Sequence, residues 1–283
     1  MRSLLRKSAR WLNRLASEEP YFASNDVQVG RNVRFGKNVV IGSERVRIGD
    51  GTVIGDNVTI TPNVFEIGDY GTIYRNCQFI GPPGEIRIGH NFTIGWGSIV
   101  DGHGGTTIGN NVGVGGHSQL WTHTLFGDVM YGCRYHSVKS LVIEDDVWFV
   151  GQCLVSPIHA GARSMAMLGS VVTRDMEADR VYAGLPAKDV TDKTGPPFAV
   201  TTLEQRRAYM GKRVEEFANR HGIRDLQARV RLLSSTQEMH TVPETVTAFN
   251  LADRTYTKRG SDLEVKLMRF LLPDAKFTPW VAK

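Results

Sequence analysis

The stretch Ile88–Val100, IGHNFTIGWGSIV, carries an apolar residue at every sixth position, and the first two of these residues are followed by glycine. The same step of six recurs in further groups of three, among them Ile48, Ile54, Ile60; Ile67, Ile73, Phe79; and Ile108, Val114, Leu120. A helix repeats every 3.6 residues and a strand every two, so neither produces this spacing. A six-residue repeat is typical of a parallel β-helix, whose stacked coils bury one continuous core.

The breaks between the groups indicate how the coils close. Within a group the step is six residues, whereas between groups it is seven, nine or eight, and once twenty-three. Three hexapeptides therefore make one coil, and extra residues enter at the same corner each time. The sequence predicts a mainly β domain shaped as a triangular prism of about seven coils, with the repeating apolar residues inside.

The repeat also predicts which residues face the core: Ile48, Ile54, Ile94, Ile108, Val114, Ile143 and Val155. After Val155 it is read as continuing at Gly161 and Met167. The glycine that follows an apolar residue is expected to start a turn with positive φ, close to the next coil. Asparagine two residues later suits the same turn, because asparagine also tolerates left-handed geometry.

Composition favours a protein that binds small anionic ligands. The 283 residues are 41% hydrophobic and 22% charged, with a formal charge of +5, which suits a nucleotide or a nucleotide sugar. Lysine and arginine are scattered without a basic-aromatic cluster, so nucleic acid is not expected as a partner. Three cysteines argue against a disulfide framework, and Cys77 and Cys153 fall at inward positions. No cysteine–histidine spacing indicates zinc, so no metal is expected, and a reducing cytoplasm fits best.

Segments without the repeat flank the predicted prism, which spans residues 27–190. Residues 1–26 predict an amphipathic helix with a basic face. The helix is expected to cap the open end of the prism. Its basic face can also attach the protein to a membrane surface, and the two roles do not exclude each other. Residues 191–283 predict a linker around Gly195 and then a small α+β appendage. Its expected elements are a helix after the capping box of Thr202 and Gln205, short strands at Thr245–Asn250 and Thr255–Lys258, and a last helix capped by Ser261.

The largest break in the repeat, between Leu120 and Ile143, adds about seventeen residues. A loop of this length on a rigid scaffold is usually functional. It contains His123, Asp128, Arg134 and His136, and His117 precedes it in the same coil.

The segment after this loop resembles a known family. It contains IEDDVWFVG at Ile143–Gly151, GSVVTRDM at Gly169–Met176 and VYAGLPAK at Val181–Lys188. These motifs are similar to those of the hexapeptide-repeat acyltransferases, and most of all to the sugar O-acetyltransferases and the galactoside and xenobiotic acetyltransferases. The resemblance implies a left-handed parallel β-helix, acetyl-CoA as cosubstrate, and a homotrimer with active sites between neighbouring prisms. The acceptor it implies is a sugar hydroxyl, as in surface polysaccharide or glycoconjugate synthesis.

The resemblance also implies roles for particular residues. His123 matches the place of the catalytic base, with His136 or His117 as alternatives. His117, Asp128, Arg134 and His136 are then candidates for contacting the acceptor. The residues that match the cofactor side of the family's site are Trp148, Gly151, Gly169, Ser170, Arg174 and Lys188. Trp148 can instead pack against the loop, and Arg174 and Lys188 can be solvated charges.

Other functions remain open from the sequence. An amino sugar linked to a nucleotide is an alternative acceptor, which would make the protein an N-acetyltransferase. A β-helix carbonic anhydrase would need three zinc-binding histidines from adjacent coils. A trimeric binding protein without catalysis would keep the fold but would have no use for a base in the loop.

Overall fold

The computed structural model describes residues 19–24 and 26–280. The chain divides into two compact units, residues 1–198 and 199–283. Residues 1–18, on which most of the expected amphipathic helix falls, lie outside the described residues. Among the described residues, no helix has the length and apolar character needed to span a bilayer.

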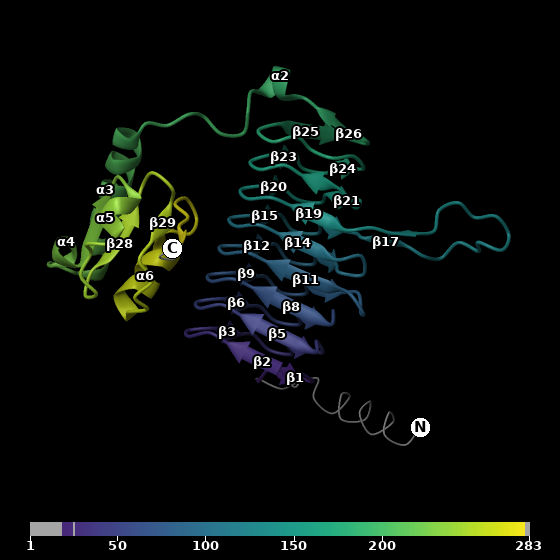
Figure 1. Ribbon diagram of the computed structural model, residues 1–283, viewed down its shortest axis with the longest axis horizontal. Coiled ribbons are helices and arrows are strands. Elements are labelled where there is room, and N and C mark those ends of the chain that lie inside the picture. Colours follow the sequence, from purple (N-terminus) through teal and green to yellow (C-terminus); the bar gives the residue numbers. More distant parts are fainter. Residues whose placement is uncertain (1–18, 25, 281–283) are drawn as a thin grey trace. The chain divides into compact units, whose positions relative to one another are not determined.

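The first unit is built from three sheets of stacked short strands, here named A, B and C (Figure 1). Sheet A holds β1 (Tyr21–Phe22), β4 (Val40–Ile41), β7 (Thr59–Ile60), β10 (Gln78–Ile80), β13 (Ile99–Asp101), β16 (Gln119–Leu120), β21 (Leu154–Val155) and β24 (Val171–Val172). Sheet B holds β2 (Asp26–Val29), β5 (Arg45–Ile48), β8 (Val64–Ile67), β11 (Glu85–Ile88), β14 (Thr106–Ile108), β19 (Leu141–Ile143) and β22 (His159–Ala160). Sheet C holds β3 (Arg34–Phe35), β6 (Val53–Ile54), β9 (Thr72–Ile73), β12 (Thr93–Ile94), β15 (Gly113–Val114), β20 (Trp148–Phe149), β23 (Met165–Ala166), β25 (Val181–Gly184) and β26 (Ala187–Asp189).

The chain visits sheets B, C and A in turn, and neighbouring strands within each sheet are parallel, except that β26 returns antiparallel to β25. From β2 to β24 this makes seven complete coils within the described residues. The predicted parallel β-helix is therefore confirmed. Strand β1 pairs with β4, so sheet A begins before residue 27.

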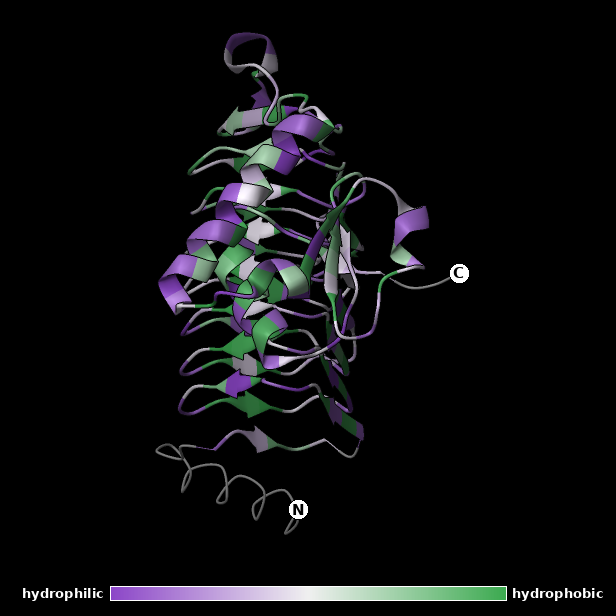
Figure 2. Cartoon of the chain, turned by 90° about the vertical axis from the view of Figure 1, so that its left-hand side faces the viewer, coloured by the Kyte–Doolittle hydropathy of each residue, from purple (hydrophilic) through white to green (hydrophobic). Residues whose placement is uncertain are grey.

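The core of this unit is the column of inward-facing repeat residues. All seven residues predicted to face inward are buried, with exposed fractions of 3% or less, and Cys77 and Cys153 are fully buried. Figure 2 shows hydrophobic segments recurring along the stacked strands. Burying such side chains is the main favourable contribution to folding, and one coil alone could not supply it.

The predicted inward positions are wrong in the last coils. Gly161 and Met167 were expected inside, but the structure buries Ala160 and Ala166 completely and leaves Met167 38% exposed. The reason is that the step from Val155, at the end of β21, to Ala160, at the end of β22, is five residues, because the turn between these strands is one residue short. One residue fewer in the turn moves every later inward position back by one.

The turn chemistry differs from the expectation in one respect. Glycine after the apolar residue is needed for close approach, since a Cβ on Gly95 would lie 2.3 Å from the backbone nitrogen of Gly116. Positive φ instead falls on the asparagines, as at Asn91 (59°) and Asn111 (62°). Glycine and asparagine therefore divide the two tasks of the turn between them.

The long break in the repeat forms an arm that projects away from the stacked coils (Figure 1). Its base is an antiparallel pair, β17 (His123–Thr124) and β18 (Ser137–Val138). The arm leaves the edge of the prism where sheet A strands turn into sheet B strands, named here the A–B edge. The turns from sheet C into sheet A form a second edge, the C–A edge.

The second unit is a small α+β fold, as the sequence predicts for residues in this region. Its sheet has the order β27 (Val230–Leu233), β28 (Thr247–Asn250), β29 (Thr255–Tyr256), β30 (Thr278–Pro279). Its helices are α3 (Leu203–His221), α4 (Leu226–Arg229), α5 (Thr236–Met239) and α6 (Asp262–Leu271). The capping box of Thr202 and Gln205 and the cap at Ser261 are confirmed. The linker before this unit contains a short helix that was not expected, α2 (Thr191–Thr194).

Candidate active site

His123 lies at the base of the arm, where it contacts an aspartate of the preceding coil. The parallel register pairs Val100 of β13 with Leu120 of β16, which brings Asp101, the last residue of β13, close to the residues that follow β16. His123 Nδ1 lies 2.6 Å from Asp101 Oδ2. The His123 side chain is 24% exposed, whereas the Asp101 side chain is fully buried. A buried carboxylate therefore supports a histidine that solvent can still reach.

The Asp101 carboxylate is held by a dense set of donors. Oδ2 accepts from the backbone N–H of Thr122 at 2.9 Å and from the Thr122 hydroxyl, and Oδ1 accepts from the backbone N–H of His103 at 3.1 Å. Burial alone would raise the pKa of Asp101, but the hydrogen bonds from Thr122, His103 and His123 outweigh it and lower that pKa below its usual value. Asp101 is therefore a carboxylate near neutral pH.

The charge on Asp101 decides the tautomer of His123. An ionised carboxylate can only accept hydrogen bonds, so Nδ1 of His123 must carry the proton that it shares with Asp101. In a neutral imidazole the other nitrogen, Nε2, then holds a lone pair. The arrangement is that of a general base oriented by a second group, and the same carboxylate stabilises the imidazolium that forms when Nε2 accepts a proton.

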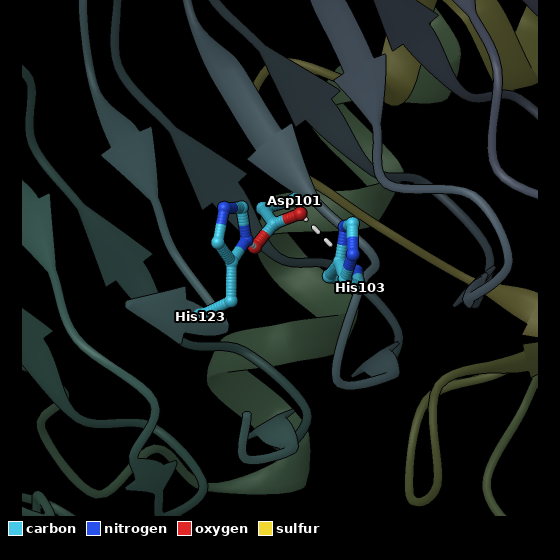
Figure 3. Close-up of side chains that lie close together, drawn as sticks. All are labelled: Asp101, His103 and His123. Carbon is cyan, nitrogen blue, oxygen red and sulfur yellow. Dashed lines mark hydrogen bonds and ion pairs between the residues drawn. The ribbon is translucent and has the colours of Figure 1, made fainter. Parts of the chain in front are cut away.

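His103 is the third side chain at this place, and the sequence did not single it out. It lies in the turn after β13, and its ring centroid is 4.6 Å from that of His123, with the planes inclined by 42°. Figure 3 shows these three side chains lying close together. Asp101, His103 and His123 each offer one ligand atom within 4.8 Å of the others, a spacing at which the three can hold a metal ion. A search for zinc ligands through cysteine–histidine spacing misses this group, which contains two histidines and an aspartate but no cysteine.

His117, an alternative base, lies at the other end of β16, on the C–A edge. Its Nε2 accepts a hydrogen bond from the indole N–H of Trp96 at 2.9 Å, and the two rings meet edge to face. Because the indole nitrogen only donates, the lone pair of His117 Nε2 is already in use. Within one chain, His117 and His123 are therefore not brought together.

Asp128, Arg134 and His136, the other expected acceptor contacts, lie exposed along the arm. Asp128 Oδ1 accepts from the backbone N–H groups of Met130 and Tyr131 and so shapes the turn of the arm. His136 Nδ1 lies 3.4 Å from the carbonyl oxygen of Gly127, across the arm. These three residues share the arm with His123 but do not join its hydrogen-bond network among the described residues.

Five of the six expected cofactor residues lie on sheet C or the C–A edge, namely Trp148, Gly151, Gly169, Ser170 and Lys188. Trp148 is on β20, where its ring lies against Gly113 of β15 and remains 48% exposed. Gly151 and Gly169 have positive φ, 152° and 73°, in successive turns of the C–A edge. Ser170 is buried, and its hydroxyl donates to the carbonyl oxygen of Met167.

The two expected phosphate partners lie apart. Lys188 is exposed on β26, at the end of sheet C. Arg174 is exposed in the turn after β24, which belongs to the A–B edge that also carries His123. One chain thus places His123 and Arg174 on one edge, and Gly151 and Gly169 on another.

Asp101 left a signal in the sequence that was not used. It directly follows the inward residue Val100, at a position where many repeats have glycine. A polar residue at a repeat glycine, one coil before the long loop, marks the position that lies beneath the loop.

No family model matches the chain. Similar solved structures include the polysialic-acid-specific acetyltransferase NeuO, at 21% identity and a TM-score of 0.39, over 68% of this chain and 98% of that one. They also include a mutant of AntD, an N-acyltransferase from Bacillus cereus in complex with dTDP and coenzyme A, at 15% identity and a TM-score of 0.45, over 64% and 92%. A hexapeptide-repeat-containing acetyltransferase from Vibrio cholerae, complexed with acetyl-coenzyme A, matches at 22% identity and a TM-score of 0.27, over 66% and 75%. Values this low transfer no substrate and no residue role to this chain.

Proposed function

We propose that this protein is an acetyl-CoA-dependent acetyltransferase that acetylates a hydroxyl of a sugar or glycoconjugate. The observation that carries the proposal is the contact of 2.6 Å between His123 Nδ1 and Asp101 Oδ2, which leaves Nε2 with a lone pair on a side chain that is 24% exposed. The acetyltransferase motifs that follow the arm, such as GSVVTRDM at Gly169–Met176, supply the reaction class.

In the proposed reaction, Nε2 of His123 takes the proton of the acceptor hydroxyl while the hydroxyl oxygen attacks the thioester carbon of acetyl-CoA. The tetrahedral intermediate then expels the CoA thiolate, which receives the proton back from the imidazolium. Asp101 stabilises that imidazolium through its negative charge, and a backbone N–H of a glycine-rich turn is the proposed donor to the oxyanion. No covalent intermediate on the enzyme is required.

We propose that acetyl-CoA lies along the late coils. Trp148, Gly151, Gly169 and Ser170 would flank the pantetheine arm, because backbone without bulky side chains permits close approach. Arg174 and Lys188 would pair with the CoA phosphates.

These groups lie on two edges of one prism, so we propose a homotrimer in which the A–B edge of one copy faces the C–A edge of the next. Light scattering should then give three times the chain mass. Mixing His123→Ala with Trp148→Ala protein, after dissociation and reassembly, should restore activity that neither has alone. Restoration requires that the two residues serve one site from different copies, and its absence from confirmed mixed trimers would contradict this arrangement.

The arm is proposed to contact the acceptor through Asp128, Arg134 and His136. Because Thr124 pairs with Ser137, residues 125–136 can be replaced by Asn-Gly, which closes a two-residue hairpin. The replaced segment is mostly exposed, so the coils should stay folded. The KM for the acceptor should rise while the KM for acetyl-CoA stays near that of the wild type.

An amino group is the alternative acceptor. A neutral amine carries its own lone pair and depends less on a base, so O- and N-acetylation predict different effects of losing His123. A panel of glycosides and nucleotide-linked amino sugars, each assayed for release of free CoA, separates the two. A non-catalytic binding protein would release no CoA with any acceptor.

A carbonic anhydrase is the less favoured alternative. Its three histidines are not assembled within the described part of this chain, where one edge carries His103 and His123 together with a carboxylate. Measured carbon dioxide hydration without CoA release would favour it.

We propose a cytoplasmic location, since acetyl-CoA is found there, with peripheral membrane contact through the basic helix expected in residues 1–26. Sedimentation with vesicles containing anionic lipid, compared between the full chain and a chain lacking residues 1–18, tests that contact.

A further inference from the structure

We propose that Asp101, His103 and His123 form a binding site for a divalent transition-metal ion such as Zn²⁺, and that a bound ion switches off the base. One ligand atom from each residue lies within 4.8 Å of the others. Two imidazoles and one carboxylate form a donor set that suits zinc, and three protein ligands leave a fourth position for water.

The site can close around an ion with a small movement. Zinc–ligand bonds of about 2.0–2.2 Å place the ligand atoms of a tetrahedral site roughly 3.3 Å apart, so the ligand atoms need to approach one another by at most about 1.5 Å. His103 lies between Gly102 and Gly104 in a glycine-rich turn, and its side chain can turn toward the other two ligands while its backbone stays in place. His123 is part-exposed at the base of the arm and can shift to admit an ion between its nitrogen and Asp101.

The carboxylate is ready to act as a ligand. Oδ2 of Asp101 accepts three hydrogen bonds, two from Thr122 and one from His123. Within the described part of the chain, Oδ1 accepts one hydrogen bond, from the backbone N–H of His103. An oxygen with a second lone pair therefore remains at Oδ1. The bonds from Thr122 would keep the carboxylate in place when the ion binds.

Metal binding removes the base whichever nitrogen of His123 is used. A neutral imidazole has one N–H group and one lone pair. If the ion binds Nε2, it occupies the lone pair that would accept the proton of the acceptor. If it binds Nδ1, the proton now on Nδ1 moves to Nε2, which then becomes a donor. In both cases His123 can no longer deprotonate a hydroxyl.

His103 makes the proposal testable, because the proposed acetyl transfer does not use its side chain. His103→Gln removes one metal ligand and leaves His123 and Asp101 in place. The backbone N–H of residue 103, which donates to Asp101, is kept. His90→Gln is the matched control, since His90 lies in the turn from β11 to β12, away from both edges that face each other in the proposed trimer, and glutamine can still accept the hydrogen bond from the backbone N–H of Asp69.

The binding experiment uses Zn²⁺ alone, by equilibrium dialysis of the full chain with metal analysis, and needs no acceptor. The wild type and His90→Gln should bind one Zn²⁺ per chain with equal affinity, and His103→Gln and His123→Asn should each bind it at least roughly tenfold more weakly. Unchanged thermal unfolding midpoints without metal establish that the variants fold. Equal affinity in the wild type and His103→Gln, or no binding to the wild type, overturns the metal site.

The inhibition experiment rests on the proposed acetyltransferase function. Zn²⁺ should suppress CoA release by the wild type, a chelator should restore it, and His103→Gln should keep its rate at the Zn²⁺ concentration that inhibits the wild type. If dialysis finds the site but no acceptor yields CoA, the metal site stands and the proposed function fails. If CoA is released and inhibition is the same in the wild type and His103→Gln, the proposed function stands and the switch fails.

Discussion

His123 and Asp101 are twenty-two residues apart in the sequence, yet His123 Nδ1 lies 2.6 Å from Asp101 Oδ2 because they sit in adjacent coils of the prism. The rigid stack of coils fixes Asp101, and four hydrogen bonds to three residues hold its carboxylate. His123 belongs to the arm, which carries the expected acceptor contacts. The core thereby orients a side chain of the functional loop.

The first prediction concerns this contact. Asp101→Asn removes the negative charge that fixes the His123 tautomer and stabilises the imidazolium, so turnover should fall roughly 10²–10⁴-fold with little change in the KM for acetyl-CoA. Asp56→Asn is the control, because the carboxylate of Asp56 also accepts a hydrogen bond from the backbone of the preceding coil, at Lys37, but forms no hydrogen bond with a histidine among the described residues. Initial rates of CoA release check the pair. Equal rates for Asp101→Asn and the wild type would show that the carboxylate has no catalytic role.

The lowered pKa of Asp101 predicts a pH dependence of stability. A carboxylate whose pKa is lower in the folded than in the unfolded chain stabilises the fold above its unfolded pKa, about 3.9, and loses that contribution as the pH falls through its folded pKa. The unfolding free energy of the wild type relative to Asp101→Asn should therefore decrease as the pH falls below about 4. Denaturant titrations at several pH values measure it. A difference that grows as the pH falls below about 4 would contradict the sign of the shift.

The close stacking of coils predicts a contrast between two glycines at the same place in the repeat. A Cβ on Gly95 would lie 2.3 Å from the backbone nitrogen of Gly116, whereas a Cβ on Gly42 would meet nothing closer than 3.8 Å. Gly95→Ala should destabilise the β-helix by about 1–3 kcal/mol, as overpacking usually does, and Gly42→Ala should be nearly neutral. Thermal or denaturant unfolding compares them. Similar midpoints for the two variants would mean that the coils can move apart at little cost.

The proposed CoA contacts predict an effect on binding without an effect on chemistry. Arg174→Ala and Lys188→Ala should raise the KM for acetyl-CoA and leave kcat nearly unchanged, because phosphate pairing is remote from the reacting carbon. Arg163→Ala is a suitable control, since Arg163 is an exposed arginine that pairs with Asp179. An unchanged KM in both test variants would place the cofactor elsewhere.

The sequence predicted the fold well because the six-residue repeat is a local pattern that every coil restates. It failed where the pattern changed by one residue, between Val155 and Ala160, since a turn of unusual length has no local signature. Of the candidate site, the sequence pointed to His123 through the length of its loop. It missed Asp101 and His103 because their proximity to His123 depends on the register between β13 and β16, which pairs residues about one coil apart.

The most direct test of the proposed function is the turnover of His123→Ala, measured as CoA release with acetyl-CoA and the best hydroxyl acceptor from the panel. Turnover should fall roughly 10²–10⁴-fold while the fold and acetyl-CoA binding persist, and His123→Asn should be nearly as impaired. The wild type should also lose activity at acidic pH, where an imidazole base becomes protonated. Near-normal turnover in His123→Ala, with loss of activity in His136→Ala or His117→Ala instead, would contradict the assignment of the base. Retention of activity by all three variants would contradict transfer to a hydroxyl.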